Sequence, residues 1–297
     1  MPLELPEWQV RAYAARVHHA AQEMEEKVAG AAREEEQAAE RIGFDKLAAM
    51  RGETPTSRLA PTPNHQADHA RRWVFPKPYV LAHQTDMVEM ARQIQNPTGE
   101  YHKAMGADLN REKSRRLIDA ARGIAAEGEG TPTTVALPAS QKNAHGATRF
   151  TQAKVLEARA RLDTATGGER GTYGPYFIFY TAHDLRTLLK DPLVSSADYV
   201  THGALMNGKP PSGYLGFEWR QTSLLPTLAG SPNQRFTIAW ARMGLGYGRN
   251  TGGQITDIGP RRDLSMAEQI FIMDMFDYVR IDDALVVEIA ISTDAAA

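Results

Sequence analysis

Five prolines between residues 51 and 80 are the feature that most limits what this chain can fold into: Pro55, Pro61, Pro63, Pro76 and Pro78. Proline lacks a backbone N–H and its ring clashes with the preceding helical turn, so no helix can continue through this stretch. The runs Trp73-Val74-Phe75 and Tyr79-Val80-Leu81 are typical of short strands. A connection of roughly 30 residues far exceeds the ~4–6 residues usual in a compact domain. We therefore expect residues 51–80 to form a long loop that reaches a partner, with a flexible insertion as the alternative.

The segment before the prolines, from Trp8 to about Met50, is rich in Ala, Glu, Arg and Gln. Its apolar residues recur at helical spacing: Val10, Tyr13, Ala14, Val17, Ala20, Ala21, Met24 and Val28. This period predicts an amphipathic helix. The apolar stripe is thin and Ala-rich, and an isolated helix is only marginally stable without a partner. We expect residues 1–50 to form an arm that lies on a neighbouring molecule, with a solvated terminal helix as the alternative.

A long helix is predicted to follow the prolines. Asn96-Pro97-Thr98 gives a start signal, with Thr98 as a candidate N-cap, and Gly123 or Gly128 ends the segment. One helical face carries the apolar residues Tyr101, Met105, Leu109, Leu117, Ala121 and Ile124. About 25 helical residues would span ~37 Å.

The rest of the chain has a mixed pattern that ends in strands. Helices are expected at 150–162 and 183–189, and strands at 134–138, 176–180, 214–219, 236–240 and 285–291, with a further ordered segment at 269–277. No internal repeat is present. Helices and strands that follow one another in this irregular order indicate the α+β class.

Composition excludes several classes of function. The 297 residues are 42% hydrophobic and 24% charged, which is ordinary for a soluble globular protein. A net charge of -2 lacks the basic excess of proteins that grip nucleic acid. The absence of cysteine removes disulfides, thiolate nucleophiles and Cys-based metal sites, and it fits a reducing cytoplasm. No secretory signal and no apolar run of ~18 residues is visible, so we expect no membrane contact.

The best match to a catalytic motif is His65–His69, in which His65, Asp68 and His69 resemble the H-x-x-E-H zinc pattern with Asp in place of Glu. That chemistry needs both imidazoles on one helical face, and the preceding prolines argue against a helix. Polar residues on a loop are therefore the favoured interpretation.

Three other segments also have simple structural interpretations. Gly244–Gly248 lacks the spacing of a dinucleotide loop and indicates a loop or strand with close backbone approach. His183-Asp184 is typical of a helix start, and Asp282-Asp283 of a charged turn before the last strand. With no catalytic, cofactor-binding or metal-ligating group left, we expect the chain not to be an enzyme and to need no cofactor.

An ordered set of residues carries a resemblance. It begins with Asp86, Asn96-Pro97, Tyr101, Arg111, Leu117-Ile118, Ala120, Gly123, Ala125, Gly128 and Val135–Pro138. It continues with Tyr176–Tyr180, His183-Asp184-Leu185, Leu188-Leu189, Ser195–Tyr199, Leu205, Gly208, Gly216-Phe217, Arg280-Ile281 and Val286–Ile289. This order, over roughly residues 86–291, resembles the major capsid proteins of tailed bacteriophages of a podophage-type branch. One departure is Ser114, where the family pattern has an acid three residues after Arg111.

The resemblance implies a Hong Kong 97-like fold with five parts. These are an N-terminal arm (1–50), an extended loop (51–82), a peripheral domain with the long spine helix (83–125), an axial domain (126–255) and a return to the peripheral sheet (256–297). It also implies self-assembly as pentamers and hexamers into an icosahedral head. That head would enclose double-stranded DNA without sequence-specific binding.

The resemblance further implies partners and a location. The partners are other copies of the chain and, in addition, scaffold, portal and cement or decoration proteins. The location is the virion capsid, after synthesis in the host bacterial cytoplasm. Two alternatives stay open at this point: an encapsulin-type compartment with the same fold, and a metal-dependent hydrolase using His65, Asp68 and His69.

Contacts between subunits are predicted on the loop and the arm. Arg and Trp are favoured interface anchors, and Arg71, Arg72 and Trp73 lie between prolines on the loop. The predicted contact residues are Arg71, Arg72, Trp73 and Phe75 on the loop and Tyr13 and Val17 on the arm.

Overall fold

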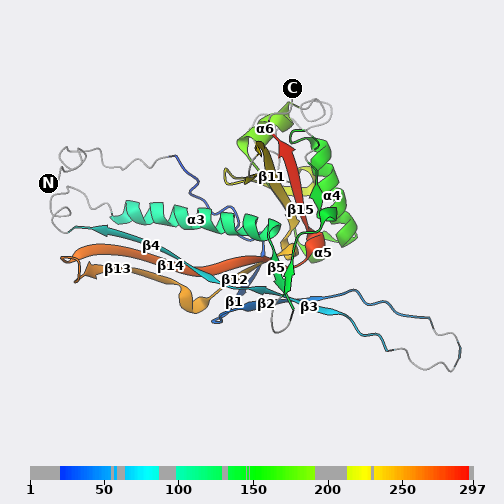
Figure 1. The fold of residues 1–297 in the computed structure, drawn as a ribbon, viewed down its shortest axis with the longest axis horizontal. Helices are drawn as coiled ribbons and strands as arrows, with labels where there is room; N and C mark the ends of the chain where they lie inside the picture. The colour runs from blue at the N-terminus through cyan, green and yellow to red at the C-terminus, as the bar shows by residue number, and fades with distance from the viewer. Residues whose placement is uncertain are drawn as a thin grey trace.

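The computed structural model describes residues 21–54, 57–58, 64–86, 98–128, 133–144, 146, 148–190, 213–228 and 231–293. These residues form three β-sheets and a small number of helices, in an α+β arrangement (Figure 1). One sheet is long and lies under a long helix, one is compact and lies beside three helices, and one carries a hairpin that projects from the rest.

The long sheet is built around a 14-residue strand, β14. Its strands are β1 (Arg33–Glu36), β4 (Lys77–Thr85), β12 (Leu245–Arg249), β13 (Ile255–Arg261) and β14 (Ala267–Arg280). β14 pairs antiparallel with β4, β12 and β13, and β1 joins β12 in parallel. The helix α3 (Thr98–Arg122) lies along this sheet (Figure 1). Its start at Thr98 and length of 25 residues agree with the predicted long helix.

The compact part contains a six-stranded sheet. Its strands are β7 (Lys142–Asn143), β8 (Tyr176–Tyr180), β9 (Phe217–Gln221), β10 (Thr227–Leu228), β11 (Ser231–Ala241) and β15 (Val286–Ser292). The helices of this part are α4 (Gln152–Thr166), α5 (Arg170–Tyr173) and α6 (Ala182–Leu189). All five residues of β8 are buried, as expected for a central strand that is covered on both faces. The strand and helix predicted at 176–180 and 183–189 are confirmed.

The third sheet has four strands in the order β2 (Ile42–Leu47), β3 (His69–Val74), β5 (Ala125–Glu127) and β6 (Thr133–Val135). β2 and β3 pair in register from Ile42 opposite Val74 to Leu47 opposite His69. Residues 48–54 and 64–68, which continue these two strands, project away from the body of the molecule (Figure 1). We call the described residues between 42 and 74 the extended hairpin.

One core joins the long sheet to the compact part. Leu117, Ile118 and Ala121 of α3 are at most 1% exposed and belong to the same apolar cluster as Trp240 of β11 and Phe276 of β14. Ile124 was predicted on the apolar face of the helix but is 70% exposed, because α3 ends at Arg122.

The helix predicted over Trp8–Met50 is wrong for the described residues 21–50, which contain β1 and β2 and no helix. Gly30 adopts a positive φ of 67°, which interrupts a helix. Ile42 and Phe44 are both fully buried, and that alternation fits a strand with one buried face. Pairing with β12 and β3 therefore overrides the helical propensity of the Ala- and Glu-rich sequence. Residues 1–20 lie outside the described residues.

The predicted division into domains differs from the sheet topology in three places. β4 was placed largely in the loop 51–82 but pairs over nine residues with β14. β12 was placed in the axial domain but lies in the long sheet, and β15 was placed in the peripheral sheet but pairs with β11 in the compact one. An apolar run such as Val286–Ile291 predicts a buried strand without saying which sheet it joins.

Candidate functional site

The base of the extended hairpin is where its strands meet the body of the subunit. Ile42 and Phe44 of β2 and Val74 of β3 turn one face of the hairpin inward. They form a small apolar cluster with Ala125, Val279 and Ile281, and every member is at most 5% exposed. This cluster is separate from the two larger cores, so the hairpin has only a thin apolar layer holding it.

The glycine-rich segment Gly244–Gly248 supplies the surface under that layer. Gly246 and Gly248 lie on the same face of β12, and a Cβ at either would sit 2.8 Å from a side-chain atom of Phe44 or Val74. Real Cβ atoms do not come so close, so only glycine lets the hairpin approach. The predicted close backbone approach is confirmed.

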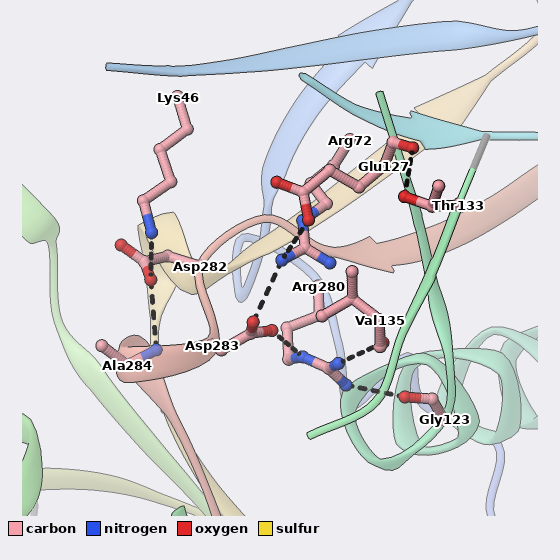
Figure 2. A network of polar contacts seen from close by, with 10 residues as sticks. All are labelled: Lys46, Arg72, Gly123, Glu127, Thr133, Val135, Arg280, Asp282, Asp283 and Ala284. Carbon is pink, nitrogen blue, oxygen red and sulfur yellow. Dashed lines mark hydrogen bonds and ion pairs between the residues drawn. The ribbon is translucent and has the colours of Figure 1, made fainter. Parts of the chain in front are cut away.

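Arg280 of β14 is fully buried and joins three elements (Figure 2). Its guanidinium donates to the carbonyl oxygens of Gly123 at 2.8 Å and Ala121 at 3.2 Å, at the end of α3. It also donates to the carbonyl of Val135 in β6 at 2.9 Å and pairs with the Asp283 carboxylate. A cation at the C-terminal end of a helix is stabilised by the helix dipole.

Asp283 also binds the hairpin itself. Its Oδ2 lies 3.0 Å from Nη2 of Arg72, a β3 residue that is 5% exposed, and the same nitrogen lies 3.2 Å from Oε2 of Glu127 in β5 (Figure 2). Asp283 thus bridges two buried arginines, one from the hairpin and one from the body. Removing one partner of such a group leaves a buried charge without compensation.

A second aspartate adds another link between the hairpin and the body. Asp282 accepts a bond from Lys46 Nζ of β2 at 2.7 Å and caps the backbone N–H of Ala284 at 3.1 Å (Figure 2). Asp282-Asp283 therefore form the predicted charged turn before the last strand, whereas no sequence pattern indicated their partners on the hairpin.

The opposite face of the hairpin base is open to solvent. The guanidinium carbons of Arg41 and Arg71 lie 4.5 and 5.4 Å from the ring centroid of Trp73. Arg71 Nη2 donates to Asp45 Oδ2 at 3.0 Å, and this hydrogen bonding lowers the pKa of the Asp45 carboxyl. The Trp73 indole N–H donates to the carbonyl of Gly128 at 2.6 Å. Both guanidinium groups are therefore held in place beside the indole ring.

The predicted contact residues fall into three groups. Arg72 is wrong as a contact between subunits, because strand alternation turns it inward, where it is buried against Glu127 and Asp283 of its own chain. Arg71 and Trp73 lie on the outward face, and Phe75 just after β3 is 40% exposed, so these three stay predictions. Tyr13 and Val17 lie outside the described residues.

The sequence did not indicate which residues attach the extended hairpin to the body, namely Arg280, Asp283, Glu127 and Lys46. For Arg280 a signal was available: it stands next to Ile281 in an apolar segment, and a charged residue that is buried there needs a partner.

The other candidate motifs do not form a site. Residues 64–68 have no regular structure and His69 begins β3. No group of three His, Cys, Asp or Glu side chains in the described parts of the chain is placed to hold a metal ion. Asp184 lies in the first turn of α6, as predicted for a helix start, and forms a capping box with the N-cap residue Thr181. None of the helices in the described ranges is long and apolar enough to cross a membrane.

The departure at position 114 also has a structural explanation. Ser114 is 1% exposed and its hydroxyl donates to the carbonyl of Asn110. Arg111 pairs instead with Asp108, one turn earlier on α3, at 2.7 Å. The arginine therefore keeps an acidic partner although the expected acid is absent.

A long helix on an elongated sheet, a compact α/β part and a projecting hairpin together define a Hong Kong 97-like shell subunit. A family model described as "Phage capsid protein" matches residues 5–293, and the chain belongs to this family. It is a phage major capsid protein, a subunit of an icosahedral head. The encapsulin and hydrolase alternatives gain no support.

Solved structures agree on the fold. The capsid of Ralstonia phage GP4 has a TM-score of 0.68 at 10% identity, over 95% of this chain and 94% of that chain. The capsid of cyanophage Pam1 has a TM-score of 0.68 at 11% identity, over 99% of both chains. That of cyanophage P-SCSP1u has a TM-score of 0.68 at 12% identity, over 96% of this chain and 93% of that chain. No curated protein sequence matches the chain.

Proposed function

We propose that this subunit assembles as pentamers and hexamers, and that its extended hairpin grips an adjacent subunit. The observation that carries the proposal is a projecting hairpin with exposed apolar side chains. Leu47 at the end of β2 is 57% exposed and Met50 beyond it 61%, and Phe75, which follows β3 at the base of the hairpin, is 40% exposed. Apolar groups on a projecting segment gain by burial against a partner.

The hairpin base supports a role in gripping a neighbour. A projecting element transmits force only if its base is fixed. Here the base of the extended hairpin is fixed by its close packing on Gly246 and Gly248 of β12 and by the Arg72–Asp283–Arg280 ion pairs. Shell interfaces of the obligate kind bury about 2,000–5,000 Å² or more. A segment that reaches beyond the globular body adds area that the body alone does not offer.

The outward face of the base would provide the polar part of the same interface. Trp73 with Arg41 and Arg71 beside its ring combines the residue types that dominate interface energies. Tyr13 and Val17 of the N-terminal arm are proposed as further contacts with a neighbour.

The contents of the head and the further partners of the subunit are proposed from its membership of the phage capsid family. The head would enclose double-stranded DNA without specific binding, since a net charge of -2 offers little general attraction to phosphate. Scaffold, portal and decoration proteins are proposed as further partners, and the host cytoplasm as the place of synthesis. The subunit would act through interfaces alone, without catalysis or a cofactor.

The test replaces the exposed apolar residues and counts particles. Leu47→Asp with Met50→Asp should leave the far-ultraviolet circular dichroism unchanged and abolish closed particles in negative-stain microscopy. The matched control, Leu47→Ile with Met50→Leu, keeps the apolar character and should assemble normally. Normal assembly of the aspartate variant would contradict the role of the hairpin.

A further inference from the structure

Residues 22–32, which we call the strap, cross from the long helix to the compact sheet before β1 begins. On the side of α3, Asn110 Nδ2 donates to the backbone carbonyl of Met24 at 2.9 Å. Lys113 Nζ pairs with Glu26 at 3.1 Å. The first half of the strap is thus fastened along the helix.

Arg111 adds two contacts on the same side. Its Nη1 lies 2.5 Å from the Gln22 side-chain oxygen and 3.4 Å from the backbone carbonyl of Glu23. The Glu23 carboxylate in turn accepts a bond from the Thr222 hydroxyl at 3.2 Å and one from the Ser223 backbone N–H. Glu23 therefore sits where the helix and the compact part meet.

Arg220 of β9 holds the second half of the strap. A single nitrogen, Nη1, donates to the backbone carbonyls of Lys27 at 2.6 Å and Ala29 at 2.9 Å. The guanidinium lies 4.5 Å from the ring centroid of Phe177 in β8, which fixes its position. Arginine suits this role because its charge and planar donors persist when it is partly buried.

The strap ends in the shared core. The indole N–H of Trp240 donates to the backbone carbonyl of Ala31 at 2.7 Å. Val28, Ala31 and Ala32 are at most 3% exposed and pack in the cluster shared by α3, β11 and β14. The turn between them is closed by Ala31 N–H donating to the Val28 carbonyl, with Gly30 in the left-handed region.

Five of these bonds share one chemical property. Side chains of Asn110, Arg111, Arg220 and Trp240 are the donors, and backbone carbonyls of the strap are the acceptors. These five bonds depend on the donor side chains of the body and on no side chain of the strap. We infer that the strap couples the two parts of the subunit, and that Arg111 and Arg220 are positioning residues that fix the path of residues 22–32 across the body.

Tryptic cleavage after Lys27 tests the inference directly. The carbonyl of Lys27 is engaged by Arg220, so a protease must first displace the strap. Arg220→Ala removes two bonds from a charged donor, and cleavage after Lys27 in the full-length chain should accelerate roughly 10- to 100-fold. Arg262→Ala is the matched control, because Arg262 is an exposed arginine on the turn between β13 and β14; it should leave the cleavage rate unchanged.

A second variant controls for the truncation of a strap side chain that makes no bond. Met24 offers its carbonyl to Asn110 while its side chain is 41% exposed, so Met24→Ala should be cleaved at the wild-type rate. If Arg220→Ala fails to fold, Arg111→Ala takes its place and should show faster hydrogen exchange at residues 24–29.

The cleavage measurement and the hydrogen-exchange measurement can each contradict the inference. Unchanged cleavage after Lys27 in folded Arg220→Ala, or unchanged exchange in Arg111→Ala, would show that these arginines do not hold the strap. Neither measurement depends on particle formation. Failure of the hairpin variants to behave as proposed would therefore leave the strap untouched, and the reverse also holds.

Discussion

The compact part and the extended hairpin of this subunit bury their side chains by different means. In the compact part, β8 is buried throughout and a large cluster of aliphatic and aromatic residues lies between the sheet and α4. In the described part of the hairpin, the buried apolar side chains are Ile42, Phe44 and Val74, which lie on the glycines of β12. Two buried arginines and Asp283 complete its attachment.

This difference fits two different roles. The compact part has its own core and keeps its shape without a neighbouring subunit. The extended hairpin has no core of its own, so its position depends on a few specific contacts at its base and on contacts with an adjacent subunit. Each of the following changes tests one side of the comparison.

The largest effect is expected at Asp283. Asp283→Ala leaves Arg72 and Arg280 buried without their shared carboxylate, and loss of one partner from a buried pair costs about 3–5 kcal/mol. Denaturant unfolding of the unassembled chain should show this loss. A loss below about 1 kcal/mol would mean that the hairpin is not held by this group. Asp263→Ala, in an exposed ion pair with Arg261, is the control and should cost little.

The compact part should respond to pH through Lys154. Burial lowers the pKa of the Lys154 ammonium from 10.5 to about 8, and its Nζ donates to the carbonyls of Thr148 and Ala290. Below pH 8 the group is charged in both the folded and unfolded states. As the pH rises from about 8 to 10.5, the native state loses the proton that the unfolded chain keeps, so stability rises.

The magnitude of this pH effect is at most about 3 kcal/mol, from ~1.4 kcal/mol per pKa unit. Unfolding free energies of wild type and Lys154→Met, measured from pH 7 to 10.5, should diverge in favour of the wild type as the pH rises. Parallel curves would mean that Lys154 does not titrate in this range.

The glycine face should tolerate no added side chain. Gly246→Val would place Cβ 2.8 Å from the Phe44 ring, and overpacking of this kind typically costs ~1–3 kcal/mol. Hydrogen exchange should speed up in β2 and β3 and stay slow in β8 and β11. Uniform acceleration across all four strands would argue against a separately attached hairpin. Gly259→Ala, where nothing lies within 4 Å of the added Cβ, is the control.

The smallest effect is expected at the cap of α6. Thr181→Ala removes the side-chain acceptor of the capping box, which costs about 0.5–2 kcal/mol. Loss of helical order should be confined to α6, as followed by exchange at residues 182–189. Thr181→Ser retains the hydroxyl and should behave as wild type.

The elements that could be predicted from the sequence are those whose pattern agrees with their environment. The aromatic run Tyr176–Tyr180 and the stripe on α3 give unambiguous periods. Residues 21–50 mislead because their alanines and glutamates favour a helix locally, while pairing with distant β12 makes a strand. Local propensity cannot report a partner more than 200 residues away.

The site was predicted in part for the same reason. Arg71, Arg72 and Trp73 were identified as a group, but which of them face outward depends on strand alternation and on the side that meets β12. Asp283 lies 211 residues from Arg72, so no spacing rule links them. The glycine motif was a local signal of the base, because close backbone approach needs glycine wherever the partner comes from.

Contact between the extended hairpin and an adjacent subunit can be tested directly by crosslinking. The chain has no cysteine, so Leu47→Cys places a single photo-crosslinker on the hairpin. Particles assembled from an equal mixture of 14N- and 15N-labelled chains are then irradiated and analysed by mass spectrometry. We expect crosslinked peptide pairs of mixed isotope composition from Leu47→Cys. Crosslinks confined to one chain, in particles that are otherwise normal, would contradict it.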